Sequence, residues 1–370
     1  MSMKALLTSS LCERFHVLHV DTADRRGIAH VDNPDLYDVW IFLKQLTQHL
    51  GVLIRKRPTL CYISISQSRL GFLRDSLFII PALLAQSSII IHLHGGGINT
   101  LYEQSGYAFK LLMNFILRRI TKFIVLGDAF KTMFSPWATP EQIEVVPNGV
   151  PDDGSHVSYL ERPCGKTEQP LRILFLSTLS RQKGLFVLLD SVALTLKEER
   201  HVKYWIAGPW WPEAAESEAQ QMVLERGLSS VVHFVGPVND KQKDEFLCLG
   251  DVFVFPGIQQ EGQPLVVLEA MARGLPVIAT DRGCLRETVV NGITGFIVPP
   301  NSPEAISEHV VYLARHPEAR ITMAGRARER FERLYSLERF ASRMERVFLE
   351  TLPVAIATKS FLPLRRNRTS

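Results

Sequence analysis

The chain has 370 residues, of which 46% are apolar and 22% charged, and its formal net charge is +4. This length favours two domains over a single hydrophobic core, and this composition is typical of a folded globular protein. The basic residues of segment 352–370, which contains no acidic residue, account for the whole net charge. Because the remaining chain is electrically balanced, we expect no nucleic-acid partner.

The cysteines and the apolar segments indicate in which cellular compartment the protein is expected. There are five cysteines, and none of them forms a C-x-x-C pair, which favours a reducing environment. The most apolar stretch, residues 77–91, is interrupted by Pro81 and by the polar residues 86–88, so we do not expect it to span a bilayer. No secretory signal is recognisable, and the prediction is a cytoplasmic protein, with attachment to the inner face of the membrane as an open alternative.

In the first half of the chain, short β-branched runs alternate with helical patterns. The predicted strands are 16–20, 60–65, 88–92, 122–126 and 143–146. Residues 3–11 favour a helix, and no glycine precedes Gly27. A Rossmann-like domain normally begins with a strand and a glycine-rich turn, so either the opening strand is missing or the domain begins in an unusual way.

Residues 107–122 predict an amphipathic helix. One face carries the apolar residues Ala108, Leu111, Leu112, Phe115 and Ile116, and the other carries Lys110, Asn114, Arg118 and Lys122. A basic amphipathic helix can lie on an anionic membrane surface. It can equally be a domain helix whose basic face is solvated, and the sequence leaves both interpretations open.

A second series of strands follows, with predicted ranges 172–177, 203–207, 231–235, 252–255, 276–279 and 295–298. Near-continuous apolar runs such as 252–255 indicate parallel strands covered by helices on both faces, and the alternation of strands and helices predicts the α/β class. Further helices are expected from Ser302–Pro303 and over 337–351.

These patterns predict the following division. Residues 1–155 form an N-terminal domain, 156–170 a linker, 171–335 a second domain, 336–351 a terminal helix and 352–370 a basic tail. The linker falls in the stretch 151–170, which is rich in proline, glycine, aspartate and serine.

The loop after the predicted strand 252–255 has the features of a phosphate-binding site. It contains Gly262 and leads into a helix that begins near Pro264. The start of a helix offers free backbone N–H groups and a positive dipole to an anionic ligand. Because proline lacks an N–H group, Gln263, Leu265 and Val266 must provide the donors.

Two glutamates flank this helix start, Glu261 in the loop and Glu269 in the second turn. Carboxylates accept hydrogen bonds well from vicinal hydroxyls, as in ribose recognition by dinucleotide-binding folds. Alone, two glutamates eight residues apart are weak evidence for a ligand site, since a dipole partner and a solvated face would give the same pattern.

The surrounding run strengthens this interpretation. Glu261, seven residues, Glu269 and Ala-Met-Ala-Arg-Gly-Leu-Pro-Val-Ile-Ala closely resemble the signature of the retaining glycosyltransferase family 4, also described as glycosyl transferases group 1. The match continues through Gly283, Glu287 and Gly295. The resemblance implies the GT-B architecture, in which two Rossmann-like domains with parallel sheets face each other across a cleft, and a terminal helix that returns to the first domain.

The resemblance also implies roles for individual residues. Glu261 would lie by the hydroxyls of the donor sugar, Glu269 would bind the ribose, and Lys183 would bind the diphosphate. The family has an arginine where this chain has Thr178. The nearby Arg181 is the candidate to replace it.

Other implied positions surround the nucleotide and the acceptor. Gly208 would face the ligand after a strand, and Val238 and Lys243 fall where relatives hold the base, although Lys243 also fits a plain surface lysine. His94 begins the run His-Gly-Gly-Gly after a predicted strand and matches an acceptor-side catalytic histidine better than His92 does. A packed histidine remains the alternative for His94.

The resulting prediction is a retaining glycosyltransferase that moves a sugar from a nucleotide-diphosphate sugar to a saccharide or lipid-linked acceptor, in polysaccharide or glycolipid assembly. No Asp-x-Asp motif lies near the predicted site, so neither a metal nor a resident cofactor is expected. Glu261 and His94 would act in catalysis. Two alternatives remain: a GT-B nucleotide-sugar epimerase, and a non-catalytic relative that binds the donor.

Overall fold

The computed structural model describes residues 14–21, 36–152, 169–212 and 214–352. The chain divides into two compact units. The first comprises Met1–Val125, Lys131–Val146 and Ala341–Ser370, and the second comprises Leu126–Phe130 and Pro147–Phe340. Each contains one parallel sheet with helices packed on it, so the predicted α/β class with two parallel-sheet domains is confirmed.

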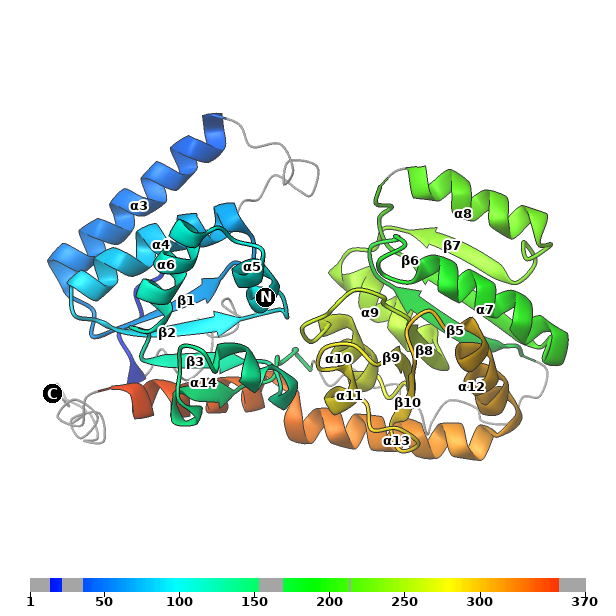
Figure 1. The fold of residues 1–370 in the computed structure, drawn as a ribbon. Helices are drawn as coiled ribbons and strands as arrows, with labels where there is room; N and C mark the ends of the chain where they lie inside the picture. The colour runs from blue at the N-terminus through cyan, green and yellow to red at the C-terminus, as the bar shows by residue number, and fades with distance from the viewer. Residues whose placement is uncertain (1–13, 22–35, 153–168, 213, 353–370) are drawn as a thin grey trace, which may run out of the picture. The chain divides into compact units, whose positions relative to one another are not determined.

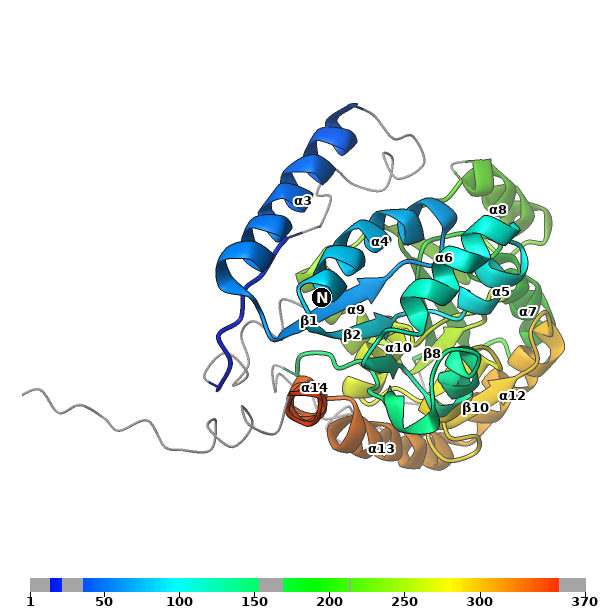
Figure 2. The same ribbon diagram turned by 60° about the vertical axis from the view of Figure 1, so that its left-hand side comes forward.

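The first unit contains a four-stranded sheet in the order β1-β2-β3-β4, with all neighbours parallel. Its strands are β1 (Leu60–Ile65), β2 (Ser88–Leu93), β3 (Lys122–Val125) and β4 (Ile143–Val145). Its helices are α3 (Leu36–Lys56), α4 (Arg69–Leu84), α5 (Ile98–Glu103), α6 (Tyr107–Leu117) and most of α14 (Leu337–Thr351), with the 3-10 helices η2 (Asp128–Phe134) and η3 (Pro140–Gln142) beside them. Helix α4 packs on β1 and β2, and α3 packs along α4 (Figures 1 and 2).

The predicted strand 16–20 was wrong. These residues are not paired in the sheet, and Val17 and Leu18 are exposed. A strand needs a neighbouring strand to satisfy its backbone groups, and an alternating pattern alone does not provide one. The predicted helix 3–11 lies outside the described residues, whose first strand is β1.

The second unit contains a six-stranded parallel sheet in the order β10-β9-β8-β5-β6-β7. Its strands are β5 (Leu171–Leu176), β6 (Val202–Ala207), β7 (Val232–Gly236), β8 (Val252–Phe255), β9 (Val277–Thr280) and β10 (Gly295–Val298). Its helices are α7 (Leu185–Glu198), α8 (Ala214–Glu225), α9 (Asp240–Leu249), α10 (Leu265–Ala272), α11 (Leu285–Thr288), α12 (Pro303–Arg315) and α13 (Pro317–Leu334).

Both faces of this sheet are buried. In β5, Ile173 and Phe175 belong to one core with residues of α7, α8 and α12, whereas Leu174 and Leu176 belong to a second core with residues of α9, α10 and α13. Successive side chains of a strand point to opposite faces, so a strand covered on both sides must be apolar throughout. This is why the continuous apolar runs predicted the strands correctly.

Helices begin where the sequence provides start signals. Helix α12 begins at Pro303 after the N-cap residue Ser302, as predicted, and α9 begins with a capping box between Asn239 and Gln242. Helix α14 has the predicted range Leu337–Thr351, and its apolar residue Phe348 contacts the ring of Tyr62 on β1 with the centroids 5.8 Å apart. Among the described helices, none is both long and apolar enough to cross a membrane.

Gly295 provides a test of the contact between β10 and β9. Its φ is +150°, and a Cβ atom would lie 1.9 Å from the carbonyl oxygen of Val277 on the neighbouring strand. We predict that Gly295→Ala lowers the free energy of opening of β9 and β10 by about 3 kcal/mol, measured by hydrogen exchange of peptides from these strands.

Gly227→Ala is the matched control. Gly227 also has a positive φ, +67°, but a Cβ atom there has no neighbour within 4 Å, so only the backbone strain of about 1 kcal/mol is expected. Equal effects of the two substitutions would contradict the proposed steric constraint.

Candidate functional site

The residues predicted to bind the donor gather at one edge of the six-stranded sheet. Arg181 and Lys183 follow β5, Gly208 follows β6, Val238 and Lys243 follow β7, and the segment 261–263 follows β8 and leads into α10. The carboxyl ends of parallel strands lie at the same edge, where ligands of α/β proteins bind. Figure 1 shows these strands and α10 within the second unit.

A lysine–glutamate pair lies in front of α10. The Nζ atom of Lys183 is 2.6 Å from Oε1 of Glu261, and the side-chain amide of Gln259 donates to the same oxygen at 3.0 Å. The two charged side chains are only 23% and 12% exposed, so their attraction is less screened than that of a surface pair. Two residues predicted separately, 78 positions apart in the chain, thus form one charged unit.

A second pair lies beside the helix. The Nζ atom of Lys243 on α9 is 2.7 Å from Oε1 of Glu269 on α10 and 3.5 Å from Oδ1 of Asp240. Burial by itself lowers the pKa of Lys243, but the hydrogen bond and charge of Glu269, together with Asp240, outweigh it and raise the pKa above its ordinary value. Lys243 is therefore a charged partner of Glu269 rather than a plain surface lysine.

The first turn of α10 has the predicted geometry. Pro264 is the N-cap residue, and the N–H of Val267 donates to its carbonyl at 3.2 Å. Leu265 and Val266 precede Val267 in this turn, where backbone N–H groups have no intrahelical acceptor. Their side chains and that of Val238 pack, partly buried, against the core behind the helix. This packing holds the turn in place.

Gln263 has a structural role that sequence reasoning missed. Its buried side chain accepts a hydrogen bond from the backbone N–H of Asn148 at 2.7 Å and donates to the hydroxyl of Thr288 at 3.0 Å. The Asn148 side chain donates in return to the Gln263 carbonyl at 3.0 Å. The adjacent Gly262 carbonyl accepts from the N–H of Cys284 at 3.0 Å. The loop in front of α10 is therefore held by hydrogen bonds to segments distant in sequence.

Glu287 is a second anchor without a predicted role. Its two carboxylate oxygens accept from the backbone N–H groups of Asp128 at 2.8 Å and Ala129 at 2.6 Å, at the start of η2. A local sequence pattern does not indicate the contact of Glu287 with Asp128 and Ala129, because these partners are more than 150 residues apart. Close by, burial together with the charges of Glu287 and Asp128 raises the pKa of the Cys284 thiol to about 12.

Of the predicted donor residues, Gly208 lies at the carboxyl edge of the six-stranded sheet, whereas the Arg181 side chain is paired with α8. The N–H of Gly208 donates to the carbonyl of Gly236 at 2.9 Å, and a Cβ atom at Gly208 would lie 1.8 Å from the carbonyl of Ser177, so the strand ends approach closely here. Arg181 instead pairs with Glu218 on α8 and stacks over the ring of Phe186 at 4.2 Å. The structure thus directs the charge of Arg181 to Glu218 and not to the Lys183–Glu261 pair.

A polar cluster lies at the carboxyl ends of β1 and β2 in the first unit. The Tyr62 hydroxyl and Nδ1 of His92 are 2.6 Å apart, and Nε2 of His94 lies 3.3 Å from the hydroxyl of Ser64. His92 is fully buried and its ring centroid is 4.0 Å from that of His94, which is partly exposed. Burial lowers the pKa of both imidazoles. His94 is therefore the histidine of this pair that can reach a ligand.

The glycine run after His94 packs against Gln67. The Gln67 side-chain carbonyl accepts a hydrogen bond from the N–H of Gly97, and a Cβ atom at Gly95 would lie 2.4 Å from the Gln67 amide nitrogen. Because these glycines have no side chain, their loop can lie directly against the loop after β1.

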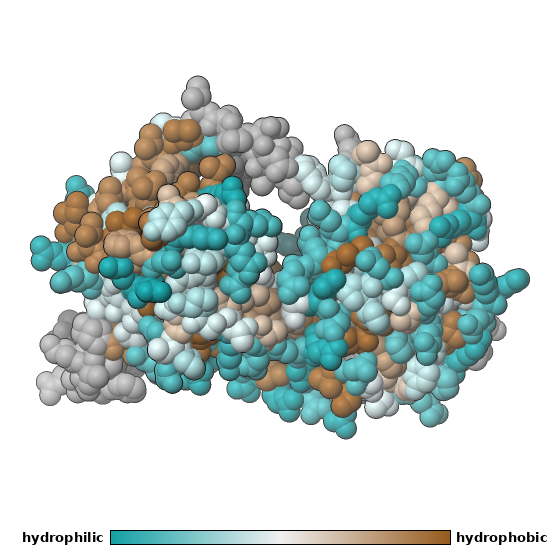
Figure 3. Space-filling view, viewed as in Figure 1, coloured by the Kyte–Doolittle hydropathy of each residue, from teal (hydrophilic) through white to brown (hydrophobic). Residues whose placement is uncertain are grey.

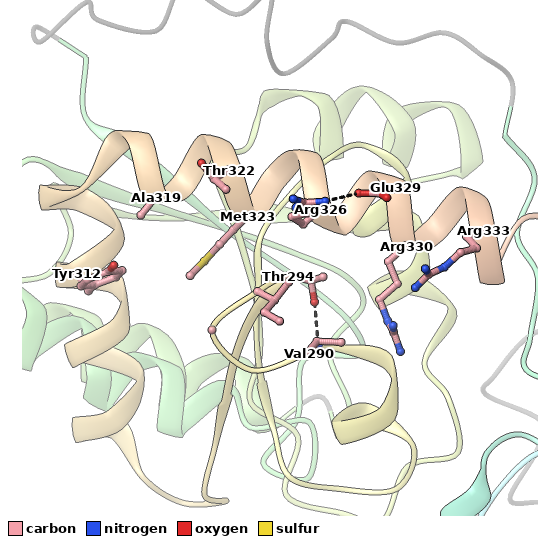
Figure 4. A pocket seen from close by; sticks show the side chains of 12 residues that line it. Val290, Thr294, Tyr312, Ala319, Thr322, Met323, Arg326, Glu329, Arg330 and Arg333 are labelled. Carbon is pink, nitrogen blue, oxygen red and sulfur yellow. Dashed lines mark hydrogen bonds and ion pairs between the residues drawn. The ribbon is translucent and has the colours of Figure 1, made fainter.

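A cavity of about 710 Å³ lies elsewhere in the second unit, between α12, α13 and the loop 290–294 (Figure 4). Two of its arginines are engaged by the protein: Arg326 pairs with Glu329 at 2.9 Å, and Arg330 donates to the carbonyls of Glu287 and Thr288. None of the predicted donor residues lines this cavity, so it is separate from the predicted donor site.

The chain is similar to several known glycosyltransferases. Residues 160–330 match the family described as glycosyl transferases group 1. Over 204 residues the chain is 30% identical to a phosphatidyl-myo-inositol mannosyltransferase of Mycobacterium leprae, covering 55% of this chain and 52% of that protein. Over 356 residues it is 24% identical to the capsular polysaccharide biosynthesis glycosyltransferase CapM of Staphylococcus aureus, covering 90% and 89%.

A D-rhamnosyltransferase, WbpZ of Pseudomonas aeruginosa, is 31% identical over 233 residues, covering 62% of this chain and 59% of that protein. The matches to the mannosyltransferase and the rhamnosyltransferase thus span little more than half of those relatives.

Among solved structures, HepE from Anabaena in complex with UDP has a TM-score of 0.69 at 19% identity, covering 84% of this chain and 82% of that one. The two parallel-sheet domains therefore have the fold of GT-B glycosyltransferases. Residues 160–330, which contain every predicted donor residue, are the part of the chain that matches glycosyl transferases group 1.

Proposed function

We propose that this protein is a glycosyltransferase that moves a sugar from a nucleotide-diphosphate sugar to a hydroxyl group of a saccharide or lipid-linked acceptor. The observation that carries the proposal is the pair of lysine–glutamate contacts, Lys183–Glu261 and Lys243–Glu269, on either side of the first turn of α10. This arrangement brings cations, carboxylates and free N–H groups together around the first turn of α10. A nucleotide-diphosphate sugar requires all three.

The leaving diphosphate determines the first part of the mechanism. Negative charge develops on it as the bond to the sugar breaks, and donors already in position stabilise that charge most effectively. The N–H groups of Leu265 and Val266 and the ammonium of Lys183 would supply these donors. Neutralisation by protein groups would make the reaction independent of a metal and of a resident cofactor.

The carboxylates would orient the hydroxyl groups of the donor. Glu269 would accept hydrogen bonds from the ribose, with Lys243 holding the carboxylate in place, and Glu261 would contact the sugar. Gly208 would allow the ligand to approach the strand ends, and Val238 would pack near the base. The resemblance to family 4 supports retention at the anomeric carbon, with the leaving phosphate helping to deprotonate the acceptor.

The names of the relatives favour transfer over the two alternatives. They include a mannosyltransferase, a rhamnosyltransferase and a polysaccharide biosynthesis glycosyltransferase. This favours a role in polysaccharide or glycolipid assembly over nucleotide-sugar epimerisation or donor binding without turnover. Product analysis after incubation with a UDP-sugar would separate a transferred sugar from an epimerised one.

The ribose role of Glu269 predicts the effect of removing its charge. Glu269→Gln should weaken the binding of the free nucleotide diphosphate by about 10-fold or more, because a hydrogen bond to a charged acceptor is worth roughly 1.5–3 kcal/mol. Calorimetry with UDP and GDP measures this loss. Glu245→Gln, which changes an exposed glutamate on the neighbouring helix, is the control and should bind normally. Equal affinity of Glu269→Gln and the unchanged protein would contradict the assignment.

Lys183 and Arg181 are both proposed to bind the diphosphate of the donor, and their substitution should have different effects. Lys183→Ala should reduce transfer strongly, whereas Arg181→Ala should reduce it less, because Arg181 must leave Glu218 before it can replace the arginine missing at position 178. Initial rates at saturating donor measure both effects. Glu218→Gln releases Arg181 and should preserve transfer. If Arg181→Ala retains full activity, Lys183 and the backbone donors suffice and Arg181 has no phosphate role.

The acceptor-side role of His94 predicts a loss of turnover without a loss of donor affinity. His94→Ala should lower the turnover rate by about 10²–10⁴-fold, as for other positioned catalytic groups. Because the pKa of His94 is lowered, its imidazole is neutral at neutral pH, and the rate should fall only when the pH drops below 6.5, its ordinary pKa.

Melting temperature, donor affinity and turnover should be measured on one preparation of His94→Ala. A destabilised protein whose folded fraction turns over normally would assign His94 to the core instead.

A further inference from the structure

Helix α4 exposes a row of leucines. Leu70, Leu73, Leu77 and Leu84 are 77%, 42%, 47% and 80% exposed. Their spacing of three, four and seven residues places them on one face of the helix. The opposite side of α4 carries the buried residues Phe72, Phe78 and Ile79. The helix therefore has a second apolar face, which is not used in the core of the unit.

The neighbouring helices extend this face. Within the described residues, twelve of the twenty exposed large apolar side chains lie on α3, α4 and α6. Besides the four leucines, these are Tyr37, Val39, Trp40, Leu43 and Ile54 on α3 and Tyr107, Leu111 and Phe115 on α6. Figure 3 shows a brown, hydrophobic area over α3 and α4. We call these twelve residues the apolar face.

Helix α3 is held against α4 by specific contacts. The rings of Phe42 and Phe78 lie edge to face with centroids 5.8 Å apart, and Nε2 of His49 lies 3.0 Å from the carbonyl of Phe78. The apolar face is thus presented by helices that are packed together.

The exposed charged residues of α3 and α4 are basic. They are Lys44, Arg55, Lys56, Arg69 and Arg74, and the exposed Arg118 and Arg119 follow α6. The acidic residues nearby are fewer: Asp75 is 4% exposed and pairs with Arg74 at 2.8 Å, Asp38 is half-buried, and Glu103 is exposed at the end of α5. An apolar surface bordered by cations matches the interior and the headgroups of an anionic membrane.

Helix α6 is partly packed in the unit and partly exposed. Ile116 is fully buried, so part of the predicted apolar face packs inside the unit. Leu111 and Phe115 remain about half exposed, and the guanidinium of Arg119 lies over the Phe115 ring at 4.0 Å. Basic and apolar side chains therefore occur together at its surface.

We propose that the apolar face docks on the surface of an anionic phospholipid bilayer, with its leucines and aromatic rings entering the headgroup boundary and its lysines and arginines contacting phosphates. A second copy of the chain fits this face less well, because symmetric contact would bring its cations together. Since the donor residues lie on other elements, docking can be tested without sugar transfer. Docking would bring a lipid-linked acceptor within reach of the protein.

Vesicle flotation provides the test. The full chain should float with vesicles of phosphatidylcholine containing about one-third phosphatidylglycerol, bind pure phosphatidylcholine much less, and be released by high salt. Leu73→Ser with Leu77→Ser should weaken partitioning by at least about tenfold, as expected when buried leucine area is lost. Lys44→Gln with Arg55→Gln should weaken it by about fivefold for each charge removed.

The matched control is Leu224→Ser with Leu249→Ser, which changes two exposed leucines of the second unit and should float normally. Melting temperatures and donor affinities of all variants should be unchanged, because the substituted residues are exposed and outside the donor site. Flotation of the unchanged protein that is unaffected by the leucine substitutions would overturn the proposal. So would a dimer in light scattering that dissociates with the same substitutions, since the face would then be an interface between copies.

Discussion

Burial of both faces of the six-stranded sheet is the constraint on which the second unit depends. Ile173 and Phe175 pack into one core and Leu174 and Leu176 into the other, so the middle of the sheet is mainly apolar. Most polar and charged groups therefore lie in the loops and helix starts at the sheet's edges. The parallel strands place their carboxyl ends at a single edge, and this is where the charged pairs and the free N–H groups of α10 lie.

The charged residues at this edge are organised in pairs. A single partly buried lysine or carboxylate would be costly, but the charges of Lys183 and Glu261, and those of Lys243 and Glu269, compensate each other at 2.6 and 2.7 Å. Each pair also keeps hydrogen-bonding capacity, since an ammonium has three donors and a carboxylate several acceptor positions. The hydrogen bonds of Gln263 and Glu287 hold the surrounding loops. The site is thus fixed by contacts between elements far apart in the chain.

The first unit distributes its apolar residues differently. Its sheet and the inner sides of its helices form a core, yet α3, α4 and α6 also expose large apolar side chains among basic ones. Exposed apolar area of this extent is usually functional in soluble proteins. In the proposed function the two units have separate tasks, since one holds the nucleotide and the other meets the acceptor and the lipid that carries it.

The sequence alone determined the α/β class, ten of the eleven predicted strands and the start of α10, because these depend on local hydrophobic pattern and on helix start signals. It also placed Lys183 and Glu261 in loops that follow strands, and Glu269 on the helix after the second of these loops. Tertiary structure decided which side chains meet. It paired Lys183 with Glu261 across 78 positions, turned Arg181 toward Glu218, and left residues 16–20 outside the sheet. Partners of this kind are chosen by the packing of distant elements, which no local pattern encodes.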